Sequence, residues 1–163
     1  MLSTLLVYIQ DDPRKDKSTG KIDKIDVKLL TRTIQTNYLG AYSLSQKIIN
    51  LQEDNEFLRI INISSGMGRL SEISEYAYAY SVSKLLLNTL TIAYSNVFSV
   101  IPKDFAIASI CPGWVKTDMG TEDGMVDSKV AAEYICSIID KKKEDINGRF
   151  LRYEEELDWQ KKM

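Results

Sequence analysis

Short apolar runs alternate with long amphipathic segments along this chain of 163 residues, and that alternation restricts the fold more than any other feature. Apolar residues at helical spacing predict helices over residues 26–50, 77–98 and 128–141. Runs rich in β-branched residues predict strands over residues 4–9, 58–64, 105–111 and 149–153. Strands that alternate with helices pair in parallel, so we predict an α/β fold, a doubly wound parallel sheet of about four strands with flanking helices.

The composition is that of an ordinary globular chain, and it excludes several classes of function. Hydrophobic residues make up 44% and charged residues 27%, and a net charge of −2 gives no general attraction to nucleic acid. No apolar run reaches the roughly 18–20 residues that a membrane span needs. The two cysteines, Cys111 and Cys136, lie in apolar runs typical of reduced core residues. We therefore predict one domain over residues 1–163, cytoplasmic, with no nucleic-acid or membrane partner.

The absence of histidine limits the catalytic chemistry that the chain could perform. Catalysis of the Ser-His-Asp or Cys-His type and imidazole-ligated metals are both excluded, so we expect no metal site. A catalytic acid or base must come from another residue type.

One candidate is the pair formed by Tyr80 and Lys84, at the start of the helix predicted over residues 77–98. A spacing of four places both side chains on one helix face. A lysine ammonium beside a phenol favours the phenolate, which would bring the tyrosine pKa down from its usual value of about 10. In a chain with nine tyrosines such a pair also arises by chance, so the pair alone does not identify an active site.

Other polar features are expected at the same edge of the sheet, because the carboxyl ends of parallel strands meet there. Ser65 follows the strand predicted over residues 58–64, and residues 112–117 follow the strand predicted over 105–111. Asn37 falls in the middle of the first long helix, where asparagine competes with the helix for hydrogen bonds. A structural or catalytic role would explain its presence there.

Together these motifs resemble the short-chain dehydrogenase/reductase family, whose sheet is Rossmann-like. The family's loop serine has a Ser-x-x-Gly context shortly before Tyr-x-x-x-Lys, as Ser65 has here, and Asn37 matches its fourth conserved position. Residues 112–119 and 148–153, followed by Trp159, look most like the carbonyl reductase and C-factor-like branch.

The resemblance implies an oxidoreductase that moves hydride between NADP or NAD and a carbonyl or alcohol substrate. Tyr80 would be the acid/base, Lys84 would lower its pKa and hold the nicotinamide ribose, and Ser65 would bind the substrate oxygen. Asn37 would anchor a water that feeds protons to Lys84. The implied cofactor-binding residues are Tyr80, Lys84, Pro112, Gly113, Val115 and Thr117.

The sequence also departs from the family. The Gly-rich turn that holds the cofactor pyrophosphate is absent, and Ile9-Gln10-Asp11-Asp12 stands where the family has Asn-Asn-Ala-Gly. We therefore expect an N-terminally truncated fold, the catalytic half alone, with weak dinucleotide binding. The alternative is a catalytically impaired module that binds a partner or acts in signalling.

Two further expectations concern assembly. The family pairs its subunits through two long helices, which implies a homodimer through residues 26–50 and 77–98. The strand predicted over residues 4–9 would be an unprotected edge that frays or pairs with another chain.

Overall fold

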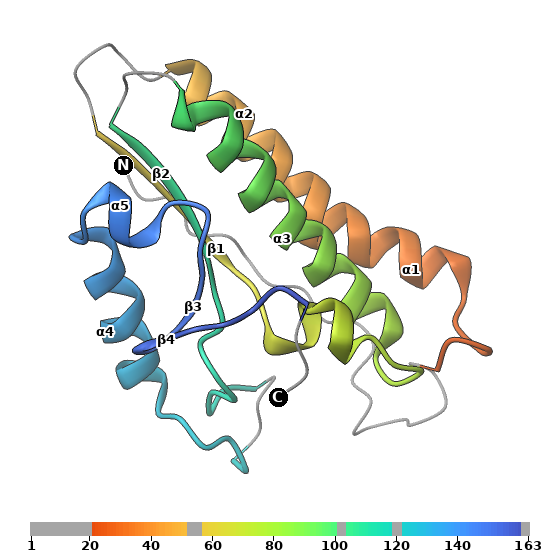
Figure 1. Ribbon diagram of the computed structural model, residues 1–163. Coiled ribbons are helices and arrows are strands. Elements are labelled where there is room, and N and C mark those ends of the chain that lie inside the picture. Colours follow the sequence, from red (N-terminus) through yellow and green to blue (C-terminus); the bar gives the residue numbers. More distant parts are fainter. Residues whose placement is uncertain (1–20, 52–56, 101–103, 119–121, 161–163) are drawn as a thin grey trace.

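A four-stranded sheet lies between two layers of helices in the computed structural model, which describes residues 21–51, 57–100, 104–118 and 122–160 (Figure 1). Strands β1 (Leu58–Ile63), β2 (Phe105–Ile110) and β3 (Phe150–Arg152) run parallel, in that order. Strand β4 (Glu155–Glu156) pairs antiparallel with β3. The α/β fold with a mostly parallel sheet is thus confirmed, while the strand predicted over residues 4–9 lies outside the described residues.

Helices cover the two faces of the sheet, as Figure 1 shows. On one face lie α3 (Tyr78–Ser99) and the long run made of α1 (Val27–Ile34), the π-helix η1 (Gln35–Leu39) and α2 (Gly40–Leu51). On the other face lie α4 (Ser128–Ile139) and the short α5 (Lys143–Ile146). Within the part of the chain that the structure describes, no helix is both long and apolar enough to cross a membrane.

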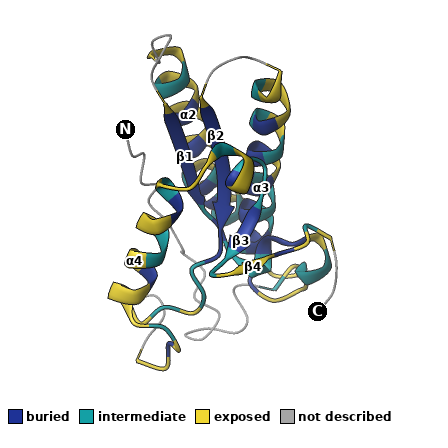
Figure 2. Ribbon diagram, turned by 60° about the vertical axis from the view of Figure 1, so that its left-hand side comes forward, coloured by how far each residue is buried: buried dark blue, intermediate teal, exposed yellow. Residues whose placement is uncertain are grey.

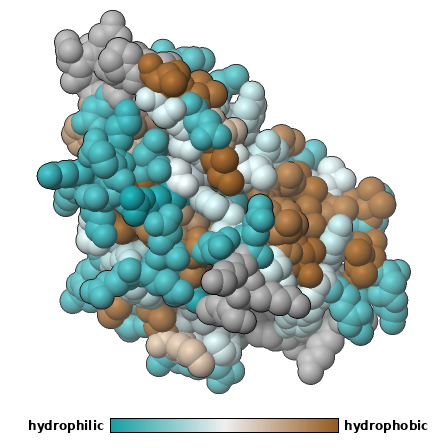
Figure 3. Space-filling view, in the orientation of Figure 1, coloured by the Kyte–Doolittle hydropathy of each residue, from teal (hydrophilic) through white to brown (hydrophobic). Residues whose placement is uncertain are grey.

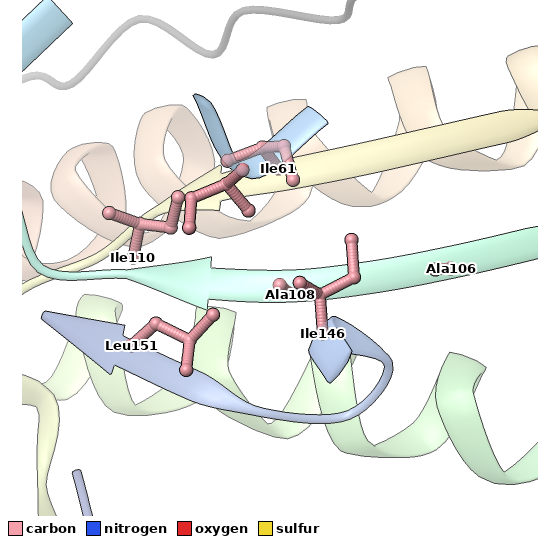
Figure 4. Close-up of a cluster of buried hydrophobic side chains, with 7 residues drawn as sticks. Ile61, Ala106, Ala108, Ile110, Ile146 and Leu151 are labelled. Atoms are coloured by element: carbon pink, nitrogen blue, oxygen red, sulfur yellow. The ribbon is translucent and has the colours of Figure 1, made fainter. Parts of the chain in front are cut away.

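The core has two halves because side chains alternate between the faces of each strand. Leu58, Ile60, Phe105 and Ile107 pack against Ile48, Ile49, Tyr94 and Phe98 of α2 and α3. The opposite face of the sheet packs against Ile138 of α4 and Ile146 of α5, and its members are Ile61, Ala106, Ala108, Ile110 and Leu151 (Figure 4). Both β1 and β2 are almost entirely buried, as the burial colouring of Figure 2 shows. This double coverage explains why their sequences are continuously apolar.

The structure refines several boundaries. Asp26 is the N-cap of α1, and its carboxylate accepts a hydrogen bond from the Lys28 amide at 3.1 Å. The helix predicted over residues 26–50 is interrupted by η1, and the helix predicted to end at residue 141 ends at Ile139. Strand β4 and helix α5 were not predicted, because neither segment has an apolar run or enough length to reveal a period.

Candidate active site

The carboxyl ends of β1 and β2 place the expected loops side by side. The Ser64 amide donates to the Ile110 carbonyl at 2.7 Å, and the Cys111 amide donates to the Leu151 carbonyl at 2.9 Å. Two loops therefore leave the same edge of the sheet: the segment Ser64-Ser65-Gly66-Met67-Gly68, called here the serine loop, and the segment that begins at Pro112. This edge is where open α/β sheets bind ligands.

Ser65 caps the short 3₁₀ turn η2 (Gly66–Gly68), and it is partly buried. Its Oγ accepts a hydrogen bond from the Met67 amide at 3.2 Å. No described residue accepts the Ser65 hydroxyl hydrogen, which is therefore available to a substrate oxygen. The adjacent Gly66 amide donates to the Cys111 Sγ at 3.3 Å, which ties the serine loop to the end of β2.

Tyr80 and Lys84 occupy the first two turns of α3. The helix begins after Ala77, a buried residue in the left-handed region with φ 49°. Lys84 is fully buried, and its Nζ donates to the Ile63 carbonyl at 2.8 Å and lies 5.5 Å from the centroid of the Tyr80 ring. The shared face inferred from the spacing is thus present in the structure.

The electrostatic state of Lys84 differs from the simple expectation of a permanent ammonium. Burial lowers the pKa of Lys84 to about 7, while the nearby Cys111 acts weakly in the opposite direction. No described carboxylate forms an ion pair with Lys84. Near neutral pH this amine can therefore both hold and release a proton.

Asn37 lies inside the π-helix η1 and is fully buried. Its Nδ2 donates to the Ser83 Oγ at 2.9 Å, and the Ser83 hydroxyl donates to the Tyr80 carbonyl at 2.7 Å. The contact therefore reaches the backbone of the turn that carries Tyr80. Asn37 thus lies in a π-helical turn inside a longer helical run, and such bulges often mark functional sites. The expected water between Asn37 and Lys84 stays a prediction.

The loop after β2 is held at both ends. Gly113 has φ +81°, a conformation that favours glycine, and the Tyr153 hydroxyl donates to the Pro112 carbonyl at 3.1 Å. Val115 forms a parallel bridge with Val126, and the Lys116 amide donates to the Val126 carbonyl at 2.8 Å. Thr117 is exposed. The loop is thus an anchored frame whose outer part is open to a ligand.

Sequence reasoning assigned no site role to several residues that lie around this edge. The Arg152 Nη2 contacts the Cys111 Sγ at 3.4 Å. The Tyr134 ring packs on the Tyr153 ring, and burial raises the pKa of Tyr134 to about 12. Asn88 lies one turn beyond Lys84 and is buried against the serine loop. Only Asn88 had a usable signal, since it shares the helix face of Tyr80 and Lys84.

The described residues fit the nicotinamide end of a dinucleotide better than its pyrophosphate. Tyr80, Lys84 and the frame around Gly113 supply hydroxyl, amine and backbone groups at one edge. A pyrophosphate favours an open helix N-terminus. The N-termini of α1 and α4 are instead closed by Asp26 and Asp127, whose carboxylates accept from backbone amides at 3.1 and 2.8 Å and would repel a phosphate.

Several known proteins are similar to this chain in sequence. Residues 17–125 match the short chain dehydrogenase family. The C-signal protein of Myxococcus xanthus is 29% identical over 142 residues, which span 86% of this chain and 82% of that protein. The (+)-neomenthol dehydrogenase of Capsicum annuum is 24% identical over a region that covers 82% of this chain but only 55% of the plant enzyme.

Solved structures give the same result. The carbonyl reductase Sniffer of D. melanogaster superposes with a TM-score of 0.71 and 27% identity, covering 86% of this chain and 61% of the fly protein. The NADPH-bound carbonyl reductase from chicken fatty liver has a TM-score of 0.67 and 24% identity, covering 90% of this chain and 69% of that enzyme, which supports the fold. Because the family match extends over more than half of the sequence, the chain belongs to the short chain dehydrogenase family.

Proposed function

We propose that this protein is an NAD(P)-dependent oxidoreductase, one catalytic domain that transfers hydride between the nicotinamide and a carbonyl or alcohol substrate. The observation that carries the proposal is the buried Lys84, which lies beside Tyr80 at the edge where the serine loop leaves the sheet and forms no ion pair with a described carboxylate. Burying an amine without a counter-ion costs stability, and such perturbed groups cluster at functional sites. The family match and the similarity to carbonyl reductases support the same activity.

In this proposal each residue of the candidate active site has a defined task. A bound NAD(P) cofactor would supply the chemistry of hydride donation or acceptance. The Tyr80 hydroxyl gives a proton to the oxygen that forms on a reduced carbonyl and takes it back in the reverse direction. The Ser65 hydroxyl hydrogen, which no described residue accepts, donates to that oxygen and orients it. Lys84, with its pKa of about 7, exchanges protons with Tyr80 near neutral pH.

The loop after β2 has a separate task. The loop that contains Pro112, Gly113, Val115 and Thr117 would contact the nicotinamide amide. Asn37, through Ser83, would hold the first turn of α3 so that Tyr80 keeps its place.

The test is the Tyr80→Phe variant, assayed with NADPH and NADH against a panel of aldehydes and ketones. We expect kcat to fall by the roughly 10²–10⁴-fold that acid–base catalysis contributes. Tyr78→Phe is the matched control, because Tyr78 belongs to the same run of tyrosines and is partly buried but has no assigned role. Unchanged turnover in Tyr80→Phe would exclude Tyr80 as the acid.

A second candidate, a partner-binding or signalling module, is favoured by one observation. The match to a protein named C-signal covers 82% of that relative, whereas the plant dehydrogenase is covered to 55%. Titration of NADPH and NADH into the purified chain, followed by calorimetry, separates the two candidates. We expect measurable binding that is weaker than submicromolar, because the N-termini of α1 and α4 are closed to phosphate. Binding of neither cofactor would favour the module.

A further inference from the structure

Helix α3 turns polar side chains toward the sheet, where an apolar stripe is the usual arrangement. Lys84, Asn88 and Thr91 lie at helical spacing, and each is at most 1% exposed. We call these three residues the polar seam. The apolar residues Leu87 and Leu90 instead pack against Ala41 of α2. Buried polar groups cost free energy unless they are hydrogen-bonded, so the partners of each member indicate what the seam does.

Asn88 binds both ends of the serine loop. Its Oδ1 accepts from the Ser64 Oγ at 2.6 Å, and its Nδ2 donates to the Gly68 carbonyl at 3.0 Å. All three residues are buried. Ser64 is in turn fixed to β2 through the Ile110 carbonyl, and the Gly68 amide donates to the Ser65 carbonyl at 2.8 Å. The loop that carries Ser65 is therefore closed onto a single amide side chain.

The same helix carries the proposed acid/base pair. Tyr80, Lys84 and Asn88 follow one another at intervals of four residues, and Lys84 binds the carbonyl of Ile63, which directly precedes the serine loop. An α-helix rises a fixed 1.5 Å or so per residue, so a group held by Asn88 has a fixed distance from Tyr80. We propose that Asn88 is a positioning residue, which sets Ser65 against Tyr80 and Lys84 in the reaction proposed above.

Thr91 provides a contrast within the same seam. Its Oγ1 accepts from the Asn62 Nδ2 at 2.9 Å and lies 2.9 Å from the Ser109 Oγ. These partners belong to β1 and β2 themselves, so Thr91 joins the helix to the sheet but does not touch the serine loop. Loss of Thr91 and loss of Asn88 each remove two buried hydrogen bonds, and only the second loss frees the loop.

The experiment compares Asn88→Leu with Thr91→Val in the full chain. Backbone hydrogen exchange at Met67 and Gly68 is measured by NMR, together with kcat and the KM for NADPH. We expect Asn88→Leu to speed exchange at these two amides by about tenfold or more and to lower kcat by up to about 10²-fold, because misplacement by about 1 Å can cost that much. The KM for NADPH should change less than about threefold, and Thr91→Val should change neither loop exchange nor kcat.

Ser64→Ala is the milder second variant, since it deletes one hydroxyl and the chain should tolerate it. It should change loop exchange and kcat in the same direction as Asn88→Leu but by less. Equal loop exchange in Asn88→Leu and Thr91→Val, or an unchanged loop in both Asn88→Leu and Ser64→Ala, would overturn the inference. If the wild-type chain shows no turnover, the proposed function fails while the exchange measurements still decide the role of Asn88.

Discussion

At the scale of single residues, the buried amine of Lys84 makes the stability of the fold depend on pH. Its folded-state pKa of about 7 lies below the ordinary value of 10.5. Between these two values the unfolded chain binds more protons than the folded chain, so stability rises with pH across that window. Below pH 7 both states are protonated, and the cost of the buried ammonium is present in full.

The Lys84→Met variant removes this titration while keeping a long side chain in the same space. We expect the variant to be the more stable protein at pH 7, by an amount on the order of a few kcal/mol. The difference should shrink as the pH rises from 7 to 9. Urea unfolding of both proteins at several pH values measures it, and two parallel stability curves would mean that Lys84 does not titrate in this range.

At the scale of elements, the contact between η2 and α3 decides how closely the serine loop can approach the helix. A Cβ added at Gly68 would lie 2.8 Å from the Lys84 backbone carbon and 2.8 Å from its Cβ, which is too close for either to remain in place. We expect Gly68→Ala to destabilise the fold by about 1–3 kcal/mol and to push the serine loop away from Tyr80. Turnover should fall along with the urea midpoint.

The control for this prediction is Gly40→Ala in the long helical run, where the nearest atom to an added Cβ lies 3.7 Å away. That change should be neutral or stabilising, because alanine is the better helix former. If Gly68→Ala unfolds at the same urea concentration as the wild type, the serine loop does not pack as closely on α3 as described above.

At the scale of the whole molecule, the outer surface of the helical layer carries exposed apolar side chains. Leu39, Tyr42 and Leu44 of the long helical run are more than a third exposed, and hydrophobic surface gathers where α1 and α3 lie (Figure 3). We expect a homodimer through this layer, as the family resemblance implies. Light scattering at micromolar concentration should give twice the chain mass of 18.6 kDa.

Tyr42→Glu places a charge in that surface and should shift the dimer to the monomer. Val130→Glu is the control, because Val130 is 49% exposed on α4 at the opposite face. A monomeric wild-type protein would refute the homodimer, and equal dissociation in both variants would place the interface elsewhere.

The sequence by itself determined the alternation of strands and helices, because hydrophobic periodicity and apolar runs can be recognised within a short stretch of the chain without its tertiary contacts. It also determined the shared face of Tyr80 and Lys84, which follows from helical geometry alone. The roles of the site residues came from resemblance and stay predictions. The burial and the hydrogen-bond partners of these residues depend on contacts between segments that lie far apart in sequence.

Only the tertiary structure decided which long-range partners the polar side chains find. Asn37 was visible as an anomaly, but its contact with Ser83 and the π-helix around it depend on how α3 crosses the first helix. The lowered pKa of Lys84 likewise results from burial under the serine loop, 16 to 20 residues earlier in the chain. Burial and hydrogen bonding between distant segments are properties of the packed chain, so no local pattern could reveal them.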